Sequence, residues 1–459
     1  MQQISDPFYG ITDPPLVNDS TVEYEYVELK EKNVTVKDLT KYEIATHNSE
    51  MWIHPRNSFL HVRGRILKDD GNAMGANDNA TLTNNGFNLF QRAKYFVEDK
   101  EIEDIENVGI ATSVLNLVEF SDDYARSAAQ NMWWYKDTAD STSYSRLLYD
   151  AADKTTPVKD LADTAEVFVN AIKTNHHFNE GFLQRLILTR NSKQVSLFLP
   201  ISRLFGFCKD INRVFKGVKH EIQLEKNSDN NIIHKIGTLN YKFELNHLSW
   251  WIPKVVPSLV EMAKLETALA SGFATELYWE SAKVYKSDVK SITDTEVDWS
   301  VTSFHHRPSH IFIIFQNQAR HNSQSETNMI FDHMDLERLR VKLNDTKQYP
   351  DNELTCNFTP EQRDYSRVYT SFLAAGLKTH DVDTGTVVSY SDFARLFPIF
   401  HIDVSRRDTQ IYETQMTTTI NVQYKLRTAP TSNYHVYCIV MFERRGLLKA
   451  DDRKLFVTL

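Results

Sequence analysis

Hydrophobic and polar residues alternate at every second position in many short stretches of the chain. Successive side chains of a β-strand point to opposite faces of a sheet, so this period indicates strands with one buried face and one solvated face. Such strands are typical of antiparallel sheets that share a single core. The stretches are residues 22–26, 60–66, 218–224, 239–246, 273–280, 338–343 and 420–426. Two further apolar runs, 311–315 and 436–442, do not alternate, and we expect them to be strands covered on both faces.

Helices are expected at only three places. The first begins with a capping-box pattern at residues 258–261 and ends at Gly272. Its expected buried stripe is Leu259, Met262, Leu265 and Leu269. The second begins at Thr359, which is followed by proline at the first helical position, and its expected stripe is Tyr365, Val368, Phe372 and Ala375. The third begins near Gly109, with Ile110, Val114 and Leu117 at helical spacing.

The order of these elements occurs twice. A strand at residues 87–97, a polar turn at 98–100 and a helix near Gly109 match a strand at 336–343, a turn at 344–347 and the helix at Thr359. The copies lie about 250 residues apart, which favours a duplicated β-domain over a small-repeat solenoid. A chance likeness between two β-rich stretches stays open. We expect residues 71–86 to form an exposed loop and residues 130–179 to project as an elaborated insertion.

Composition and charge exclude several classes of protein. The 459 residues carry 52 basic and 61 acidic side chains and a net charge of -9, which disfavours nucleic-acid binding by the whole chain but leaves a local basic patch possible. Only 14 residues are glycine, too few for several phosphate-cradling loops. Cys208, Cys356 and Cys438 are sparse and odd in number, so we expect buried free thiols and no disulfide framework.

Targeting signals are not found in the sequence. No apolar run approaches the roughly 20 residues of a membrane span. The first six residues have neither a basic nor an apolar region, so we expect no secretory signal peptide.

The motifs with the clearest catalytic mechanics, such as GxGxxG, GxxxxGK[ST], HExxH and GxSxG, are absent. Two weak candidates for metal ligation remain: His176 and His177 with Glu180, and Asp332 and His333 with Asp335. In both sets we favour an ordinary polar segment without a metal. In the second set, a strand would point Asp332 and Asp335 to opposite faces. His305, His306 and His310 are expected at the exposed end of a buried strand. The sequence therefore predicts no catalytic, cofactor or metal site.

Paired arginines and tryptophans supply the remaining candidates for binding. Arg406-Arg407 and Arg444-Arg445 are expected at solvated strand ends, with phosphate contact as the alternative. Tryptophans can serve as stacking platforms for bases or sugars, but core or interface packing is favoured in so aromatic a chain. The tryptophans concerned are Trp133, Trp134, Trp250 and Trp251.

Several segments resemble double jelly-roll major capsid proteins of polinton- and adintovirus-like double-stranded DNA viruses. Residues 87–109 (FNLFQRAKYFVEDKEIEDIENVG) are similar to a strand, turn and helix-entry segment of that family. Residues 199–208 (LPISRLFGFC) with 218–224 (VKHEIQL) resemble another, and residues 238–256 and 434–444 resemble second-half regions. The likeness covers most of the chain except residues 130–179, and its motifs are structural.

The resemblance implies a mainly β fold of two tandem eight-stranded antiparallel jelly-roll sandwiches with a few short helices. We place an N-terminal arm at residues 1–20, the first jelly roll at 21–230 and the second at 231–459. The implied function is structural: homotrimeric, pseudo-hexagonal capsomers that assemble inside the host cell into an icosahedral shell. The implied partners are other copies of the chain and a penton or minor capsid protein, without enzymatic activity, cofactor or small-molecule substrate. Contact with the genome is left open. The alternative hypotheses are a carbohydrate-binding or glycan-processing β-sandwich that uses Trp133, Trp134 or Trp251 as platforms and, ranked below it, a cupin-like metalloenzyme.

Overall fold

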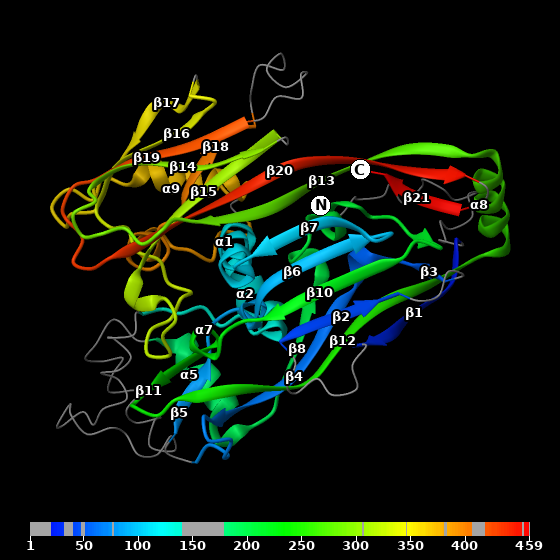
Figure 1. Cartoon of the computed structure of the whole chain (residues 1–459), viewed down its shortest axis with the longest axis horizontal. Helices are drawn as coiled ribbons and strands as arrows, with labels where there is room; N and C mark the ends of the chain where they lie inside the picture. The colour runs from blue at the N-terminus through cyan, green and yellow to red at the C-terminus, as the bar shows by residue number, and fades with distance from the viewer. Residues whose placement is uncertain are drawn as a thin grey trace, which may run out of the picture.

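Two β-sandwiches lie side by side in the computed structural model of the chain (Figure 1). It describes residues 20–31, 40–46, 51–75, 78–139, 179–304, 307–345, 347–380, 383–405, 418–451 and 454–458.

The first sandwich contains two sheets of four main strands. One sheet has the order β1-β12-β4-β8 and the other β2-β10-β6-β7, with all pairs antiparallel. The strands are β1 (Thr21–Lys30), β2 (Lys41–Ala45), β4 (Phe59–Lys68), β6 (Phe90–Val97), β7 (Lys100–Glu106), β8 (Val195–Pro200), β10 (His220–Lys226) and β12 (Tyr241–Pro257). Short β3 (Trp52–Ile53) and β9 (Phe215–Lys216) extend the first sheet, and β5 (Asn79–Leu82) pairs with β11 (Ile233–Ile236).

The second sandwich repeats this plan. Its sheets have the orders β13-β20-β15-β18 and β14-β19-β16-β17. The strands are β13 (Phe273–Lys286), β14 (Glu296–Phe304), β15 (Arg307–Asn317), β16 (Leu336–Leu343), β17 (Lys347–Thr355), β18 (Phe400–Asp403), β19 (Thr418–Leu426) and β20 (Tyr434–Asp451), and β21 (Lys454–Thr458) adds to β20.

The two sandwiches share one topology. If the eight main strands of each are numbered along the chain, both have one sheet in the order 1-8-3-6 and the other in the order 2-7-4-5. This pairing of first with last strand and second with seventh is the double Greek-key arrangement of a jelly roll. The predicted fold class, a double jelly roll, is confirmed.

Matching hairpins occur at equivalent places in the two sandwiches. Glu98 and Asp99 connect β6 to β7, and Asn344 and Asp345 lie in the connection from β16 to β17. All four residues have positive φ, and Glu98 and Asp99 form a two-residue turn of the type I′ kind between the paired Val97 and Lys100. The second turn is one residue longer, since Leu343 pairs with Lys347. Because the two sandwiches share their strand order, the chance-likeness alternative for the repeat is wrong.

Helices connect the strands, and one of them contacts both sandwiches. Helix α1 contacts β6 of the first sandwich and both β13 and α9 of the second. The helices are α1 (Val108–Glu119), α2 (Asp122–Arg126), α5 (Glu180–Thr189), α6 (Gly206–Asp210), α7 (Asp229–Ile232), α8 (Leu259–Ser271), α9 (Ser366–Ala375) and α10 (Tyr390–Arg395). Short 3₁₀ turns lie at Pro55–Asn57, Gly86–Leu89, Ala128–Met132, Arg190–Ser192, Ile201–Arg203 and Gln318–Arg320.

Some predicted boundaries are wrong. We placed the second sandwich from residue 231, but β12 pairs with β1 and β4, so the first sandwich extends to Pro257 and helix α8 links the two. The helix expected from Thr359 begins at Ser366, because a turn that starts at Thr359 and a bridge between Asn357 and Asp364 occupy the preceding residues. The segments 1–19 and 140–178 lie outside the described residues.

The segment predicted to be an exposed loop, residues 71–86, is largely folded. It contains strand β5, and Asn85 is buried beside α1. The Nδ2 atom of Asn85 donates to Thr112 Oγ1 at 2.8 Å and to Ser113 Oγ at 2.9 Å, so its polar group is satisfied without water. A composition rich in asparagine and glycine therefore gave a wrong prediction of exposure.

Candidate assembly unit

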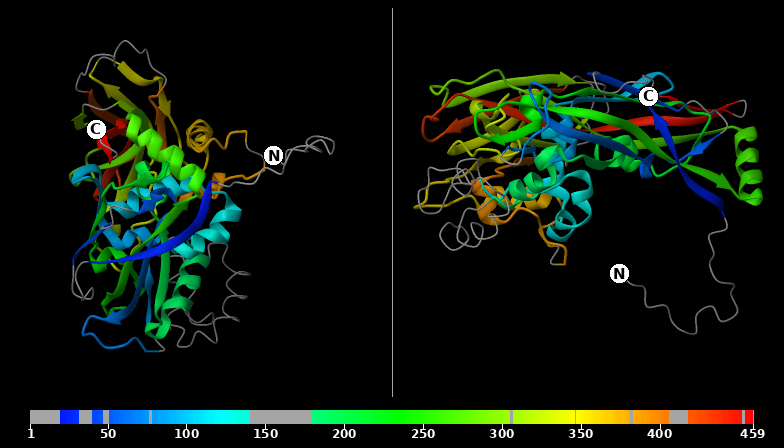
Figure 2. Two further views of the ribbon diagram at one scale, coloured as in Figure 1. Left: turned by 90° about the vertical axis from the view of Figure 1, so that its right-hand side faces the viewer. Right: turned by 90° about the horizontal axis from the view of Figure 1, so that it is seen from below.

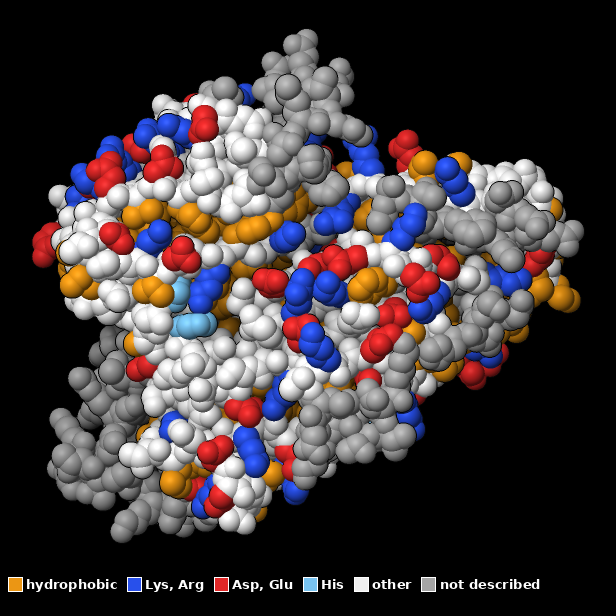
Figure 3. All heavy atoms as spheres, in the orientation of Figure 1, with side chains coloured by type: hydrophobic (Ala, Val, Ile, Leu, Met, Phe, Trp, Pro, Cys, Tyr) orange, Lys and Arg blue, Asp and Glu red, His pale blue; other side chains and the backbone are white. Residues whose placement is uncertain are grey.

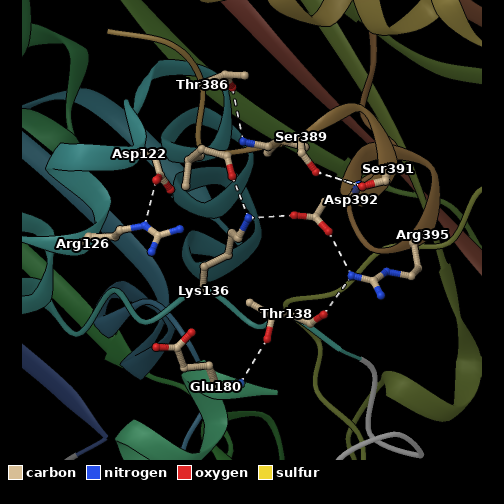
Figure 4. Close-up of polar contacts among 12 residues, drawn as sticks. Asp122, Arg126, Lys136, Thr138, Glu180, Thr386, Ser389, Ser391, Asp392 and Arg395 are labelled. Carbon is tan, nitrogen blue, oxygen red and sulfur yellow. Dashed lines mark hydrogen bonds and ion pairs between the residues drawn. The ribbon is translucent and has the colours of Figure 1, made fainter. Parts of the chain in front are cut away.

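The first junction between the sandwiches is a group of ion pairs and hydrogen bonds beside helix α10 (Figure 4). Lys136 of the first sandwich lies 3.0 Å from Asp392 and donates to the carbonyl oxygen of Val387 at 2.7 Å. Arg395 donates to the carbonyl oxygen of Thr138 at 2.9 Å and also pairs with Asp392. Burial alone would raise the pKa of Asp392, but Lys136 and Arg395 outweigh it and hold the pKa below its ordinary value.

The second junction surrounds the buried carboxyl of Glu103 on β7. It accepts hydrogen bonds from the backbone N–H groups of Phe207, at 2.5 Å, and Gly206, at 3.1 Å. Arg444 of β20 donates to the carbonyl oxygen of the neighbouring Ile102 at 2.8 Å. Burial raises the pKa of Glu103 to about 7, although the two N–H groups and Arg444 act in the opposite direction.

At the third junction, the side-chain amide of Gln324 forms two hydrogen bonds with the backbone of Tyr241, as a neighbouring strand would. Gln324 follows β15, and its Oε1 accepts from Tyr241 N at 3.0 Å while its Nε2 donates to Tyr241 O at 2.7 Å. The backbone of Lys235 donates to the carbonyl oxygen of Gln324 at 2.8 Å. Three separate junctions therefore join the sandwiches into one unit.

A buried ion pair fixes the stem of the segment between residues 139 and 179. Arg185 of α5 pairs with Asp137 at 2.7 Å, and both side chains are almost completely buried. Arg185 also donates to the carbonyl oxygen of Leu82 at 3.0 Å. Asn179 donates to Asp137 Oδ1 and to the carbonyl oxygen of Ala139, both at 3.0 Å. The chain thus leaves and rejoins the first sandwich at one place.

The outer faces of the strands are polar where the alternation predicted a solvated face. On the first sandwich Arg92 lies 2.6 Å from Asp104, and Lys94 lies 2.7 Å from Glu101. Figure 3 shows basic and acidic side chains interleaved over this region, around β6, β7 and β10. The equivalent face of the second sandwich has mixed charges too, including Arg338 and Glu296 at 2.7 Å. Exposed mixed charges of this kind keep a surface soluble but add little stability.

Exposed apolar side chains gather at the start of β1 and on α8. The alternation predicted a buried face at Val22, Tyr24 and Tyr26, but Val22 is 72% exposed and both tyrosines are also exposed. The apolar face of this edge strand lies on the outer side of the sheet, where the Tyr26 ring lies 5.0 Å from that of half-buried Phe59. The predicted stripe of α8 is also wrong for Leu259, because that residue is 85% exposed. Such patches mark interaction surfaces.

The metal-ligand candidates at Asp332, His333 and Asp335, which the structure describes, do not form a site. Among the described residues, no group of three His, Cys, Asp or Glu side chains is placed to hold a metal ion. Asp332 accepts from Asn317 N and pairs with Arg320, whereas Asp335 accepts from Thr428. His333 stacks on Phe358 with ring centroids 4.6 Å apart. These residues have structural partners.

Only some of the remaining histidine and arginine candidates lie among the described residues. Glu180 is exposed at the start of α5, and His176 and His177 lie outside the described residues, as do His305, His306, Arg406 and Arg407. His310 bonds His401 at 3.1 Å. Arg445 is exposed, as expected for a solvated strand end, but Arg444 is not, since it bonds Ile102 and Ser281.

The tryptophans are in the core rather than on the surface. Trp133, Trp134 and Trp250 are buried, and Trp251 is half-buried with its Nε1 donating to Ser249 at 3.2 Å. Trp133 and Trp134 were placed in the projecting insertion, but residues 130–139 pack on the first sandwich. Cys208, Cys356 and Cys438 are buried free thiols, as predicted. Within the described ranges, no helix combines the length and apolarity needed to cross a membrane.

The comparisons with known proteins agree with this fold. A family model described as a double jelly roll-like domain matches residues 155–445. A chain in the cryo-EM structure of the Sputnik virophage superposes with a TM-score of 0.59 at 9% identity, over 99% of this chain and 92% of that one.

Two further solved structures are similar. The quasi-atomic model of the PBCV-1 virus capsid gives a TM-score of 0.50 at 10% identity, over 97% of this chain and 99% of that one. The mavirus major capsid protein gives 0.47 at 11% identity, over 95% and 90%. No curated protein matches the sequence. Because the family model covers more than half of the residues, the chain belongs to the double jelly roll-like family.

Proposed function

We propose that the chain is a viral major capsid protein that assembles as homotrimers. The observation that carries this proposal is the presence of two sandwiches with one topology, joined by hydrogen bonds at three junctions in one chain. Three such chains around a threefold axis present six similar lobes. A trimer of this kind packs in a near-hexagonal array while it uses only threefold symmetry.

The solved structures support this proposal through the fold. The whole chain, rather than one sandwich, superposes on a chain of the Sputnik virophage and on the PBCV-1 virus capsid. Two of the sequence segments that resemble major capsid proteins are residues 87–109 and 199–208. The first contains strands β6 and β7 and the start of α1, and the second connects β8 to α6. These segments build the junction around Glu103, so the resemblance lies in the parts that hold the sandwiches together.

The partners and the place of action follow from the same proposal. The chain contacts copies of itself within and between capsomers, and a penton or minor capsid protein closes the shell at positions that a pseudo-hexagonal trimer does not fill. The protein works in the virion capsid after assembly inside the host cell, and it has no enzymatic activity of its own. The sugar-binding alternative has lost most of its structural support, because two of its three tryptophans, Trp133 and Trp134, are buried and Trp251 is half-buried.

Negative-stain electron microscopy of the purified full-length protein tests the proposal. We expect capsomers with a triangular or hexagonal outline, or closed particles built from them. A field that contains only particles of single-chain size, at concentrations and salt conditions that permit assembly, would contradict it. Titration with neutral oligosaccharides in parallel tests the alternative, since saturable binding lost in Trp251→Ala would favour a lectin.

A further inference from the structure

Helix α8 presents an apolar surface that the described part of the chain leaves uncovered. It links the sandwiches at one end of the molecule (Figures 1 and 2). Leu259 and Val260 in its first turn are 85% and 68% exposed, and Leu269 is its one fully buried residue. The exposed side continues through Ala263 and Ala268. Figure 3 shows hydrophobic side chains at the surface of this end.

A cavity of about 440 Å³ opens along the same helix. Its wall combines α8 with the first sheet of each sandwich and is mainly apolar: Trp52, Val214, Leu265, Ala268, Leu269, Phe273 and Leu448. Arg213, Asn212 and His54 provide its polar lining. The cavity has the size and composition of sites that accept one or two large apolar side chains.

The N-terminal segment of the chain begins beside this surface. The carbonyl oxygen of Ser20 accepts a hydrogen bond from Ser258 N, the N-cap residue of α8, at 2.9 Å, and Thr21 pairs with Pro257. Nineteen residues precede Ser20. Phe8 is twelve residues away from Ser20, a reach of up to about 40 Å when extended. Helix α8, with 13 residues, is only about 20 Å long.

The composition of this segment matches the surface of α8. It carries three acidic residues, Asp6, Asp13 and Asp19, and no lysine or arginine. On α8 itself the charges are already paired, Lys264 with Glu261 at 3.2 Å and Glu266 with Lys216 at 3.1 Å, while Arg213 provides a cation at the cavity. The large apolar residues of the segment are Ile4, Phe8, Tyr9, Ile11, Leu16 and Val17. The match is therefore mainly apolar, with Arg213 at the edge of the cavity as the cation that complements the acidic residues of the segment.

We propose that residues 1–19 dock on α8 of their own chain, with Phe8 and Tyr9 in the cavity and Leu16 and Val17 over Leu259 and Val260. The covalent connection at Ser20 gives the segment a millimolar effective concentration at this surface, which favours its own chain over a neighbour. This inference does not rest on the capsid function, because it concerns each chain whether or not it assembles.

Cysteine cross-linking tests the placement in the full-length protein. Gly10→Cys is combined with Ala268→Cys, which lies in the cavity wall, or with Ala270→Cys, an exposed residue about 200° around the helix. The natural cysteines are buried and do not compete. With a short bismaleimide, we expect the Ala268 pair to link at least about tenfold faster than the Ala270 pair, since tethering alone would make the two equal.

A one-to-one mixture of ¹⁴N- and ¹⁵N-labelled protein separates the two possible sources of the segment. Cross-linked peptides of unmixed isotope content support docking on the same chain, whereas mixed peptides overturn the same-chain assignment. Equal rates for the Ala268 and Ala270 pairs overturn the proposal as a whole.

Hydrogen exchange gives a second readout that uses no cross-link. In Phe8→Asp/Tyr9→Asp, the amides of α8 should exchange about tenfold faster than in the natural protein, because the cavity loses its cover. The control variant Gln2→Asp/Gln3→Asp adds the same charge at positions that are not apolar, and it should leave the exchange rate of the α8 amides unchanged. If both double variants exchange like the natural protein, α8 is not covered by this segment and the proposal is wrong.

Discussion

The side-chain amide nitrogen of Asn179 lies 3.0 Å from the carbonyl oxygen of Ala139, so positions 40 residues apart meet at one point on the first sandwich. The same amide nitrogen also donates to Asp137, which pairs with Arg185. The two ends of the segment between Ala139 and Asn179 are therefore held together by these contacts. The fold of the first sandwich on either side does not depend on how long the segment is.

Removal of residues 140–178 should leave the protein folded. Because Ala139 and Asn179 are in contact, a linker of about four glycine and serine residues can replace the segment without moving either end. We expect the free energy of unfolding to change by less than about 1 kcal/mol, since loop-closure entropy varies slowly with length. Urea unfolding of the shortened protein measures this. A loss of cooperative unfolding would show that the segment is part of the core.

The stem itself should be intolerant of change. Asp137→Ala leaves the guanidinium of Arg185 buried without its carboxylate partner, which costs about 3–5 kcal/mol in comparable pairs. The matched control is Asp122→Ala, which removes a carboxylate from an exposed pair with Arg126 and should cost less than about 1 kcal/mol. Equal urea midpoints for the two variants would rule out a structural role for the buried pair.

Gly206 should be irreplaceable at the junction of the sandwiches. A Cβ atom at this position would lie 1.6 Å from the carbonyl oxygen of Glu280 on β13, a backbone atom that cannot rotate away. We expect Gly206→Ala to lower the thermal unfolding temperature and to cost about 1–3 kcal/mol or more. Gly75→Ala is the control, since its Cβ would have no neighbour closer than 3.7 Å. Unchanged stability of Gly206→Ala would mean that the sandwiches are not held together here.

Glu103 should make stability decrease as the pH rises from about 4.5 to 7. Burial raises its pKa to about 7 in the folded protein, above the ordinary carboxyl value of 4.5, so the folded state favours the protonated form. Its contribution is therefore fully present below pH 4.5 and is lost as the pH rises through 7, at a total cost on the order of 3 kcal/mol, with little further change above about pH 8.

Comparison with Glu103→Gln isolates this effect. Buried histidines such as His220 and His234, whose pKa values burial lowers, also change stability below about pH 6.5, but the natural protein and the variant share that contribution. The difference between their urea midpoints from about pH 4.5 to 8 therefore reports on Glu103. We expect the stability of the natural protein relative to the variant to fall over this interval. Parallel curves for the two proteins would show that Glu103 does not titrate there.

The alternation of side chains was sufficient to predict most strands, because each strand buries one face against a single core. Strand β19 is the clearest case, with every second residue from Thr418 to Leu426 buried. The pattern failed at β1 and α8, where apolar residues face outward. A sequence pattern reports which residues avoid water, but it does not tell whether their partner is the same chain or another surface.

The junctions between the sandwiches could not be predicted from local patterns. Lys136 and Asp392 are 256 positions apart, and Arg444 and Ile102 are 342 apart, so nothing in either neighbourhood identifies its partner. The resemblance at residues 199–208 pointed to a structural role for the Gly206 turn but not to its contact with Glu280. The end of the first sandwich was misplaced because β12 follows a polar run that looked like a linker.

Sedimentation velocity of the full-length protein at micromolar concentration tests the central claim most directly. If two equivalent sandwiches in one chain serve to build a threefold capsomer, the smallest stable species has three times the chain mass of 53.2 kDa. A single species at one chain mass, unchanged as the concentration is raised, would contradict the account.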